Sequence, residues 1–155
     1  ILGHSENRTT GDTDSLINGK IKSALKSKLK VIFCFGETFS ERKKKQTKKI
    51  LTNQIKKGLR NIKDINKIIF SYEPVWSIGT GITPSIKELE NNIAFIKLKL
   101  KKIFKSKNSV ILYGGSVNNK NIEYLKKIES IDGFLIGGSS LNTNKFIDII
   151  KKTFI

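Results

Sequence analysis

Residues 67–81 read KIIFSYEPVWSIGTG, and this stretch decides the fold of the chain. Its first six residues are an apolar run rich in the β-branched and aromatic residues that strands prefer. Glu73 and Pro74 end the run at once, and Gly79 and Gly81 follow within the next seven positions. The stretch therefore predicts a buried strand that leads directly into a loop carrying a carboxylate and flexible glycines.

Three other segments have the same form. Apolar runs at 30–35, 110–113 and 133–136 each end in glycine or in a polar cluster. None of them alternates apolar with polar residues, which is typical of parallel strands covered on both faces. A short stub at residues 1–3 precedes them and is also predicted to be a strand. We therefore expect a parallel sheet whose two faces are both covered.

The segments between these runs have helical patterns. Residues 86–103 carry an apolar stripe at three- and four-residue spacing, with Thr83 as the expected N-cap and Pro84 at the first helical position. A helix is also expected near the C-terminus with Phe146, Ile149, Ile150 and Phe154 on one face, and weaker patterns cover 14–28, 41–60 and 121–127. Alternating strands and helices imply right-handed parallel crossovers. A doubly wound sheet and an eight-stranded barrel both fit, and periodicity alone does not separate them.

Composition narrows the classes of function. The chain has 155 residues, which suits one domain, and a net charge of +17. Its lysines are spread along several helical segments and aromatics do not interleave with them, so nucleic-acid binding is not expected. No apolar run is long enough to span a membrane. One cysteine, Cys34, and one histidine give neither an internal disulfide nor a credible zinc site, so nothing argues for secretion and we expect no metal. We also expect a cytoplasmic protein that uses no cofactor.

The polar residues at the strand ends distinguish between the two folds. In chain order these motifs are 3–6 (GHSE), 34–37 (CFGE), 72–81 (YEPVWSIGTG), 113–117 (YGGSV) and 133–138 (GFLIGG). Together they resemble the triosephosphate isomerase family, and the ten-residue motif is highly specific to it. The resemblance implies a (β/α)₈ barrel of the TIM type, of which residues 1–155 would form a partial domain from the end of the fourth strand to the last helix. In that fold the chemistry lies at the C-terminal ends of the strands.

The resemblance assigns three catalytic residues. Glu73 matches the base that moves a carbon-bound proton, and a carboxylate beside Tyr72 and Trp76 can be desolvated and made more basic. His4 matches the family's electrophile, which is known as a neutral histidine at a helix N-terminus, so this role is implied rather than worked out from the sequence. Glu6 matches a glutamate that helps to arrange the charged site.

Further positions match the family's phosphate site and lid. Gly79, Ser116, Gly137 and Gly138 match phosphate-binding positions, where glycine lets backbone N–H groups approach phosphate oxygens. Residues 74–81 match the mobile lid. Supporting roles around the lid and the site are implied for Ser5, Glu37, Pro74, Trp76 and Tyr113. In particular, Tyr113 and Ser116 are expected to hold the closed lid, and Glu37 is expected to contact Trp76.

Two departures from the family pattern are visible. Asn7 stands where the family has the first arginine of His-Ser-Glu-Arg-Arg, which leaves the packing or the subunit contact near it in doubt. A complete barrel has about 250 residues, so about 95 are expected to be missing, namely the first three βα units and most of the fourth strand. These would carry the catalytic lysine and most of the contact of a homodimer. We therefore expect the chain alone to be inactive and prone to aggregation.

The resemblance implies interconversion of dihydroxyacetone phosphate and glyceraldehyde 3-phosphate, a glycolytic and gluconeogenic reaction on a small phosphorylated triose. Three other interpretations compete with it. The chain could belong to a phosphate-binding barrel that acts on a different substrate, to a basic module that binds polyanions, or to a half-barrel that pairs with another chain.

Overall fold

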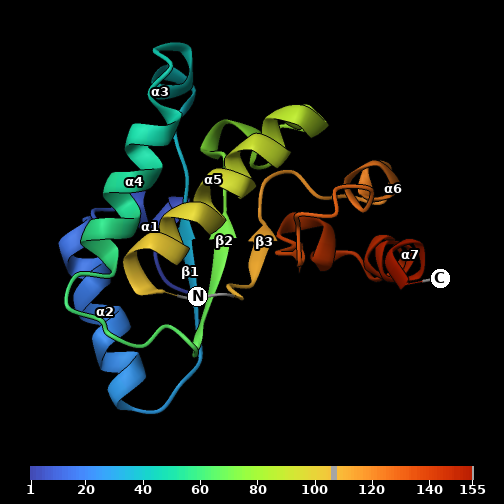
Figure 1. Cartoon of the computed structure of the whole chain (residues 1–155). Helices are drawn as coiled ribbons and strands as arrows, with labels where there is room; N and C mark the ends of the chain where they lie inside the picture. Colours follow the sequence, from blue (N-terminus) through green and yellow to red (C-terminus); the bar gives the residue numbers. More distant parts are fainter. Residues whose placement is uncertain (106–107, 155) are drawn as a thin grey trace.

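The computed structural model describes residues 1–105 and 108–154, and its centre is a sheet of parallel strands. The strands are β1 (Val31–Phe35), β2 (Ile68–Tyr72), β3 (Ile111–Tyr113) and β4 (Gly133–Phe134). They lie side by side in chain order, β1-β2-β3-β4, and every neighbouring pair is parallel (Figure 1). A doubly wound sheet reverses its strand order partway across, whereas a barrel wall does not. The observed order is therefore that of part of a barrel wall.

The first residues extend this wall by one position. Leu2 forms a parallel bridge with Phe33, and its backbone N–H donates to the Ile32 carbonyl at 2.8 Å. The Cys34 N–H in turn donates to the Leu2 carbonyl at 2.8 Å. The predicted strand stub is confirmed only at Leu2, as an isolated bridge, and it places the residues that follow it at the same end of the sheet as the ends of β1 to β4.

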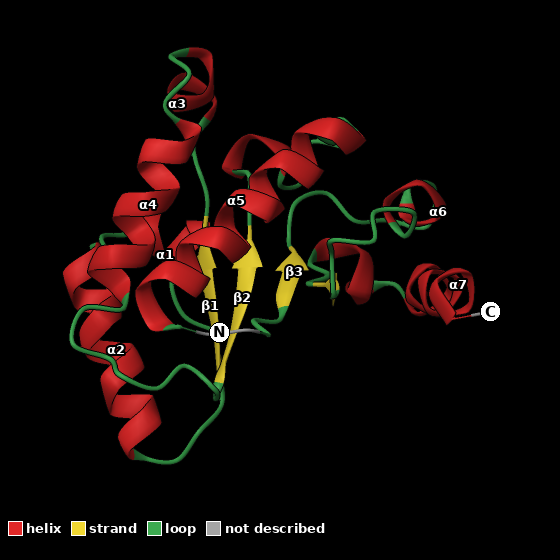
Figure 2. Cartoon of the chain, viewed as in Figure 1, coloured by secondary structure: helices red, strands yellow, loops and turns green. Residues whose placement is uncertain are grey.

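Seven α-helices and two 3₁₀ turns connect and flank the described strands (Figure 2). The helices are α1 (Ser5–Thr9), α2 (Asp14–Lys26), α3 (Phe39–Lys43), α4 (Thr47–Gly58), α5 (Ile86–Phe104), α6 (Ile122–Leu125) and α7 (Thr143–Phe154). The 3₁₀ turns are η1 (Val75–Ser77), directly after β2, and η2 (Gly138–Leu141), after β4.

Two helix predictions need correction. The segment 41–60 forms two helices, because Lys45 adopts a left-handed conformation with φ of 56° and ends α3 before α4 begins. The N-cap of α5 is Ser85, whose hydroxyl accepts the Glu88 N–H at 3.2 Å, and not Thr83 with Pro84. Threonine and serine are both good caps, so sequence alone did not separate them.

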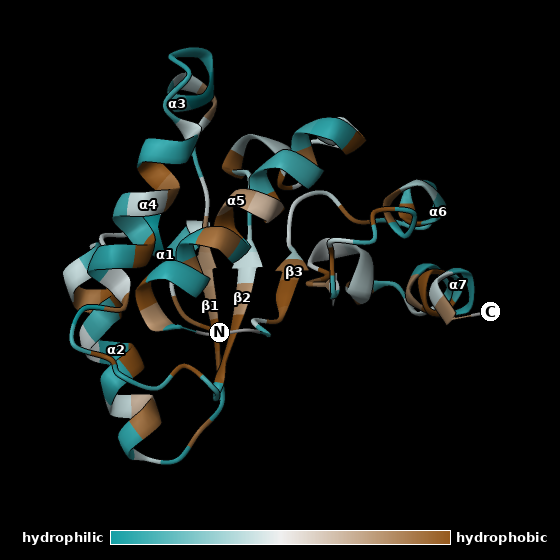
Figure 3. Cartoon of the chain, viewed as in Figure 1, coloured by the Kyte–Doolittle hydropathy of each residue, from teal (hydrophilic) through white to brown (hydrophobic). Residues whose placement is uncertain are grey.

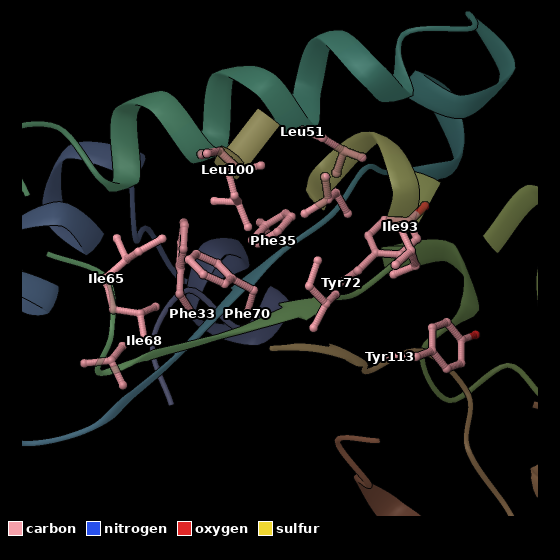
Figure 4. Packing of buried hydrophobic residues seen from close by; sticks show 14 of the residues in the cluster. Phe33, Phe35, Leu51, Ile65, Ile68, Phe70, Tyr72, Ile93, Leu100 and Tyr113 are labelled. Atoms are coloured by element: carbon pink, nitrogen blue, oxygen red, sulfur yellow. The ribbon is translucent and has the colours of Figure 1, made fainter. Parts of the chain in front are cut away.

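The hydrophobic core lies between the sheet and helices α2, α4 and α5, as the brown inner faces of these elements indicate (Figure 3). Phe33, Phe35 and Phe70 meet in tilted and edge-on ring contacts, with centroids 5.3–6.5 Å apart. Tyr72, Leu51, Ile93 and Leu100 pack around them (Figure 4).

The opposite face of the sheet is less covered. Ile32, Ile69 and Leu112 alternate with the core residues and therefore point to this second face. All three are only half-buried, because α2, α4 and α5 all pack on the other side. The prediction that both faces are covered holds only in part, because Cys34 and Ser71 on this second face are fully buried whereas Ile32, Ile69 and Leu112 are not.

The described residues contain no helix long and apolar enough to cross a membrane. Within the same residues no group of three or more His, Cys, Asp or Glu side chains is arranged to hold a metal ion.

Candidate active site

A cavity of about 500 Å³ lies at the C-terminal end of the sheet. The loops that follow the stub, β2, β3 and β4 all contribute to its wall. Six of the seven predicted catalytic and phosphate-binding residues are in this wall: His4, Glu6, Gly79, Ser116, Gly137 and Gly138. Residues more than 130 positions apart in the chain therefore face one space.

His4 is fixed at the start of α1, of which it is the N-cap. Its Nδ1 accepts the backbone N–H of Glu6 at 3.4 Å. The Glu6 carboxylate is 3.8 Å from the same nitrogen. The two contacts exclude each other, because the amide contact needs a bare Nδ1 and an ion pair needs a protonated one. The amide contact is the shorter, so we assign a neutral ring with its proton on Nε2.

The neighbours of His4 differ in their surroundings. The Glu6 side chain is 86% exposed, so in this structure it reaches solvent as well as the cavity. Asn7 is also exposed. Arg8 is the residue that ties this loop to the fold, since it donates to the carbonyls of Gly3 and Cys34 and to the Asp14 carboxylate. Packing of the loop therefore rests on Arg8 and does not depend on the Asn7 side chain.

Glu73 lies behind the cavity wall rather than in it. The residue is only 2% exposed, and the Ser71 hydroxyl donates to its carboxylate at 3.3 Å. Burial raises the pKa of the Glu73 carboxyl group, while hydrogen bonds from the Cys34 thiol, the Ser71 hydroxyl and the Ser5 N–H oppose that rise, as would a positive charge on the His4 ring. The carboxyl group is therefore a stronger base than an exposed glutamate, and it is adjacent to both His4 and Ser5.

Glycines let the backbone close tightly around this carboxylate. A Cβ on Gly114 would be 2.8 Å from the Glu73 Cγ and 2.6 Å from the Ser71 Oγ. A Cβ on Gly36 would be 1.8 Å from the Glu73 carbonyl oxygen. Any larger residue at either position would displace Glu73, which explains why glycine follows both β1 and β3.

The first turn of the loop after β2 is held by a buried network. The Trp76 indole N–H donates to Glu37 at 3.0 Å, which is the contact expected from the sequence. The Tyr72 hydroxyl donates to the other Glu37 oxygen at 3.1 Å and accepts from the Asn92 amide at 2.9 Å. Burial raises the pKa of Glu37, and the hydrogen bonds from Trp76 and Tyr72 oppose that rise.

Ser77 joins this loop to the loop after β3, a role that the sequence did not predict. Its hydroxyl donates to the Ile82 carbonyl at 2.6 Å and lies 3.0 Å from the Tyr113 hydroxyl. The Ser116 N–H donates to the same oxygen at 3.2 Å. Tyr113 and Ser116 thus contact residues 74–81 through Ser77, and burial raises the pKa of Tyr113 to about 12. The sequence alone carries no signal for this role, because the burial of Ser77 and its contacts are visible only in the structure.

Several of the residues that line the cavity are glycines. Gly79 and Gly81 have φ of 70° and 77°, which residues with a Cβ rarely adopt. Gly137 and Gly138 lead into η2, and the first N–H groups of any helical turn lack partners within that turn. Such a wall can offer backbone donors to an anion.

Comparison with known proteins agrees with this geometry. A family model described as triosephosphate isomerase matches residues 1–153. A protein named triosephosphate isomerase from Thermodesulfovibrio yellowstonii is 44% identical over 154 residues, which cover 97% of this chain and 63% of the relative. Proteins of the same name from Borrelia garinii subsp. bavariensis and Mycoplasma mobile are 46% and 41% identical, and the matched regions cover 62% and 61% of those relatives. The chain therefore spans a little over three fifths of the length of these curated relatives.

Proposed function

This chain belongs to the triosephosphate isomerase family, and from this premise we propose its function. The chain supplies the base, the electrophile and the phosphate-binding site of an enzyme that interconverts dihydroxyacetone phosphate and D-glyceraldehyde 3-phosphate. The observation that carries the proposal is the shared cavity, which has His4 and the glycine-rich loops in its wall and the buried Glu73 directly behind it.

Glu73 is the base of this reaction. Its carboxylate removes a proton from one substrate carbon, which leaves an enediolate, and returns the proton to the adjacent carbon. A raised carboxyl pKa favours this task because it brings the basicity of the group closer to that of the medium. Glu73 is not among the residues that line the cavity in this structure, so its carboxylate must move forward to reach a bound substrate.

His4 is the electrophile. A neutral ring with its proton on Nε2 can donate a hydrogen bond to the substrate oxygens as negative charge develops on them. The α1 N-terminus supports the neutral form, because the Glu6 N–H occupies the other ring nitrogen. Glu6 assists by arranging charge beside the ring.

The phosphate group binds at the glycine-rich part of the cavity wall. Gly79, Ser116, Gly137 and Gly138 offer it backbone and hydroxyl donors, and glycine permits the close approach. The lid, residues 74–81, closes over the substrate and excludes water. Tyr113 and Ser116 act on the lid through Ser77, which they already contact in this structure.

The chain works as part of a longer protein. Support comes from its coverage of about 62% of the curated relatives and from the half-open second face of the sheet. We propose that the remaining part supplies the first three βα units and a catalytic lysine. The complete protein is then a cytoplasmic homodimer that acts in glycolysis and gluconeogenesis without a cofactor.

Turnover by a completed barrel tests this proposal. For this test, about 95 N-terminal residues of the Thermodesulfovibrio yellowstonii relative are fused to the N-terminus of this chain. We call the fusion the joined protein. We expect it to interconvert the two triose phosphates and to be inhibited by phosphoglycolate, a short phosphate-bearing mimic of an enediolate. His4→Gln should lower kcat by on the order of 10²-fold, the usual cost of one lost charge stabiliser.

Asn7→Gln is the matched control, because Asn7 is an exposed neighbour of His4. Its kcat should be unchanged. The proposal would be contradicted by a folded joined protein that does not turn over triose phosphates. Unchanged activity in His4→Gln would also contradict it. A preference for a different phosphorylated sugar would favour a related barrel enzyme instead.

A further inference from the structure

The Ser139 side chain links two loops that line the same part of the cavity. Its hydroxyl donates to the Val117 carbonyl at 2.8 Å. Ser139 is the second residue of η2, in the loop after β4, and Val117 lies in the loop after β3. Both residues line the cavity. The strands themselves are joined through the Leu135 N–H, which donates to the Tyr113 carbonyl at 2.9 Å. Ser139 therefore joins the two segments beyond the end of the sheet.

The loop after β3 is firmly held. Ser116 and Val117 are buried, at 8% and 6% exposure. The Asn121 side chain donates to the Ser116 carbonyl at 2.9 Å and accepts the Asn118 N–H at 2.8 Å. The Ser116 N–H donates to the Ser77 hydroxyl at 3.2 Å. Burial and these hydrogen bonds fix where this loop stands in the cavity wall.

The loop after β4 has much less support. Gly137 and Gly138 are exposed, and a Cβ on either would meet no heavy atom of the described residues within 4 Å beyond its chain neighbours. The Ser140 N–H and hydroxyl donate to the Gly137 carbonyl at 2.9 and 2.7 Å. These two bonds keep the shape of the turn, but they do not fix its place relative to the loop after β3. The bond from Ser139 does.

From this contrast we infer that Ser139 is a positioning residue for the substrate phosphate. Its hydrogen bond holds the turn at Gly137 and Gly138 beside Ser116, so that donors from both loops reach one phosphate group. The hydroxyl proton of Ser139 is committed to Val117, so the residue acts through the loop rather than on the phosphate. The inference rests on the proposed function for the identity of the anion, although the hydrogen bond does not.

The size of the effect follows from the kind of contact. Donors that already stand at the right spacing bind an anion more tightly than donors that must first be ordered. One hydrogen bond between neutral groups changes such an equilibrium by about two- to tenfold.

Ser139→Ala in the joined protein tests the inference, with Ser140→Ala as the matched control. Ser140 is the next residue of η2, its hydroxyl bonds only within its own turn among the described residues, and it does not line the cavity. The first readout is the affinity for inorganic phosphate, measured by titration calorimetry. Ser139→Ala should bind phosphate about two- to tenfold more weakly, and Ser140→Ala should bind it as the unaltered protein does. Ser139→Thr keeps the hydroxyl and should bind more tightly than Ser139→Ala.

The second readout separates KM from kcat for D-glyceraldehyde 3-phosphate. Ser139→Ala should raise KM about two- to tenfold and leave kcat within about twofold, because Ser139 holds neither Glu73 nor His4. A general loosening of the site would lower kcat as well. The third readout is hydrogen exchange without any ligand. Exchange should be faster in Ser139→Ala at residues 137–142 and unchanged at residues 114–121.

These readouts separate the possible failures. Unchanged phosphate affinity in Ser139→Ala would overturn the inference, and so would an equal loss in Ser140→Ala or a fall in kcat at constant KM. If the unaltered joined protein bound no phosphate, the proposed function would fail and the positioning role with it. The exchange measurement would then still decide whether Ser139 holds the turn.

Discussion

Single residues show how burial and chemistry are linked in this site. Glu73 and Glu37 are both almost fully buried, yet their surroundings differ. Glu37 accepts hydrogen bonds from Trp76 and Tyr72 on both of its oxygens. Glu73 has the Ser71 hydroxyl at 3.3 Å and lies near the Cys34 thiol, whose own pKa is raised by burial and by the Glu73 charge. The first arrangement favours a fixed structural role, and the second favours a group that can move and exchange a proton.

The raised pKa of Glu73 predicts a pH-dependent effect on stability. A carboxyl group whose pKa is higher in the folded protein holds its proton more tightly there, so its contribution to stability is present below about pH 4.5, its ordinary value, and is lost as the pH rises through the raised value. In the joined protein, Glu73→Gln should therefore be more stable than the unaltered protein at pH 7. Denaturant unfolding at pH 7 and pH 4 measures this difference, which should shrink at the lower pH.

Glu90→Gln is the control for that measurement, because Glu90 is exposed on α5. It should change the free energy of unfolding by no more than about 0.5 kcal/mol at either pH. A Glu73→Gln variant that is less stable at pH 7 would show that the buried carboxylate is stabilised rather than strained by its surroundings.

The sequence predicted the residues that touch the cavity better than those that support them. His4 and the glycines were assigned because their motifs resemble those of a known family, and these motifs stand at strand ends, which a parallel fold brings to one edge of the sheet. Ser71 and Ser77 were missed because a serine in an apolar run or in a loop gives no signal until its neighbours in space are known. The position of Glu73 behind the cavity wall could not be predicted from the sequence either, because it depends on tight contacts with Gly36 and Gly114.

Among the elements, strands were easier to predict than helix ends. Apolar runs of four to six residues, each followed by glycine or a polar cluster, located all four described strands. The break between α3 and α4 depends on Lys45 in a left-handed conformation, and lysine has no special preference for that conformation. The N-cap of α5 was misplaced by two residues for a similar reason, since two good caps stand close together.

Asn18 joins helices α2 and α4, and the hydrophobic pattern of the sequence did not predict this contact. This residue of α2 is buried, and its side-chain amide donates to the carbonyls of Gly58 at 2.8 Å and Arg60 at 3.0 Å. It thereby supplies hydrogen-bond donors to carbonyl groups at the end of α4 and holds α2 against α4. Asn18→Ala should lower the free energy of unfolding by about 1–3 kcal/mol, because buried acceptors lose their partner.

Asn53→Ala gives the comparison for that change, because Asn53 is an exposed residue of α4. Denaturant unfolding of both variants in the joined protein measures the difference. Equal losses in the two variants would mean that the Asn18 bonds contribute nothing specific to the packing of α2 against α4.

At the scale of the whole molecule, the chain has one complete core and one incomplete face. The core side buries aromatic and aliphatic side chains from the strands and from α2, α4 and α5. The other side leaves Ile32, Ile69 and Leu112 half-buried, and the outer edge of β4 adjoins an apolar cavity of about 390 Å³ lined by Phe134, Phe146 and Ile149 among others. Open sheet edges beside apolar surface favour association with other chains.

We therefore predict that the 155 residues alone associate into large species and show no isomerase activity, whereas the joined protein forms a defined oligomer and is active. Sedimentation velocity and a turnover assay on both proteins measure this. Isolated chains that sediment as one small species and turn over triose phosphates at the rate of the joined protein would contradict the prediction.

The most direct test of the central claim follows the carbon-bound proton itself. The joined protein is incubated with dihydroxyacetone phosphate in D₂O, and deuterium incorporation at the reacting carbons is followed by proton NMR. The account predicts that label enters the substrate and product in the unaltered protein and in Glu90→Gln, and that Glu73→Gln slows it by about 10²- to 10⁴-fold, the usual contribution of a positioned base. Labelling at an undiminished rate in a folded Glu73→Gln protein would contradict it.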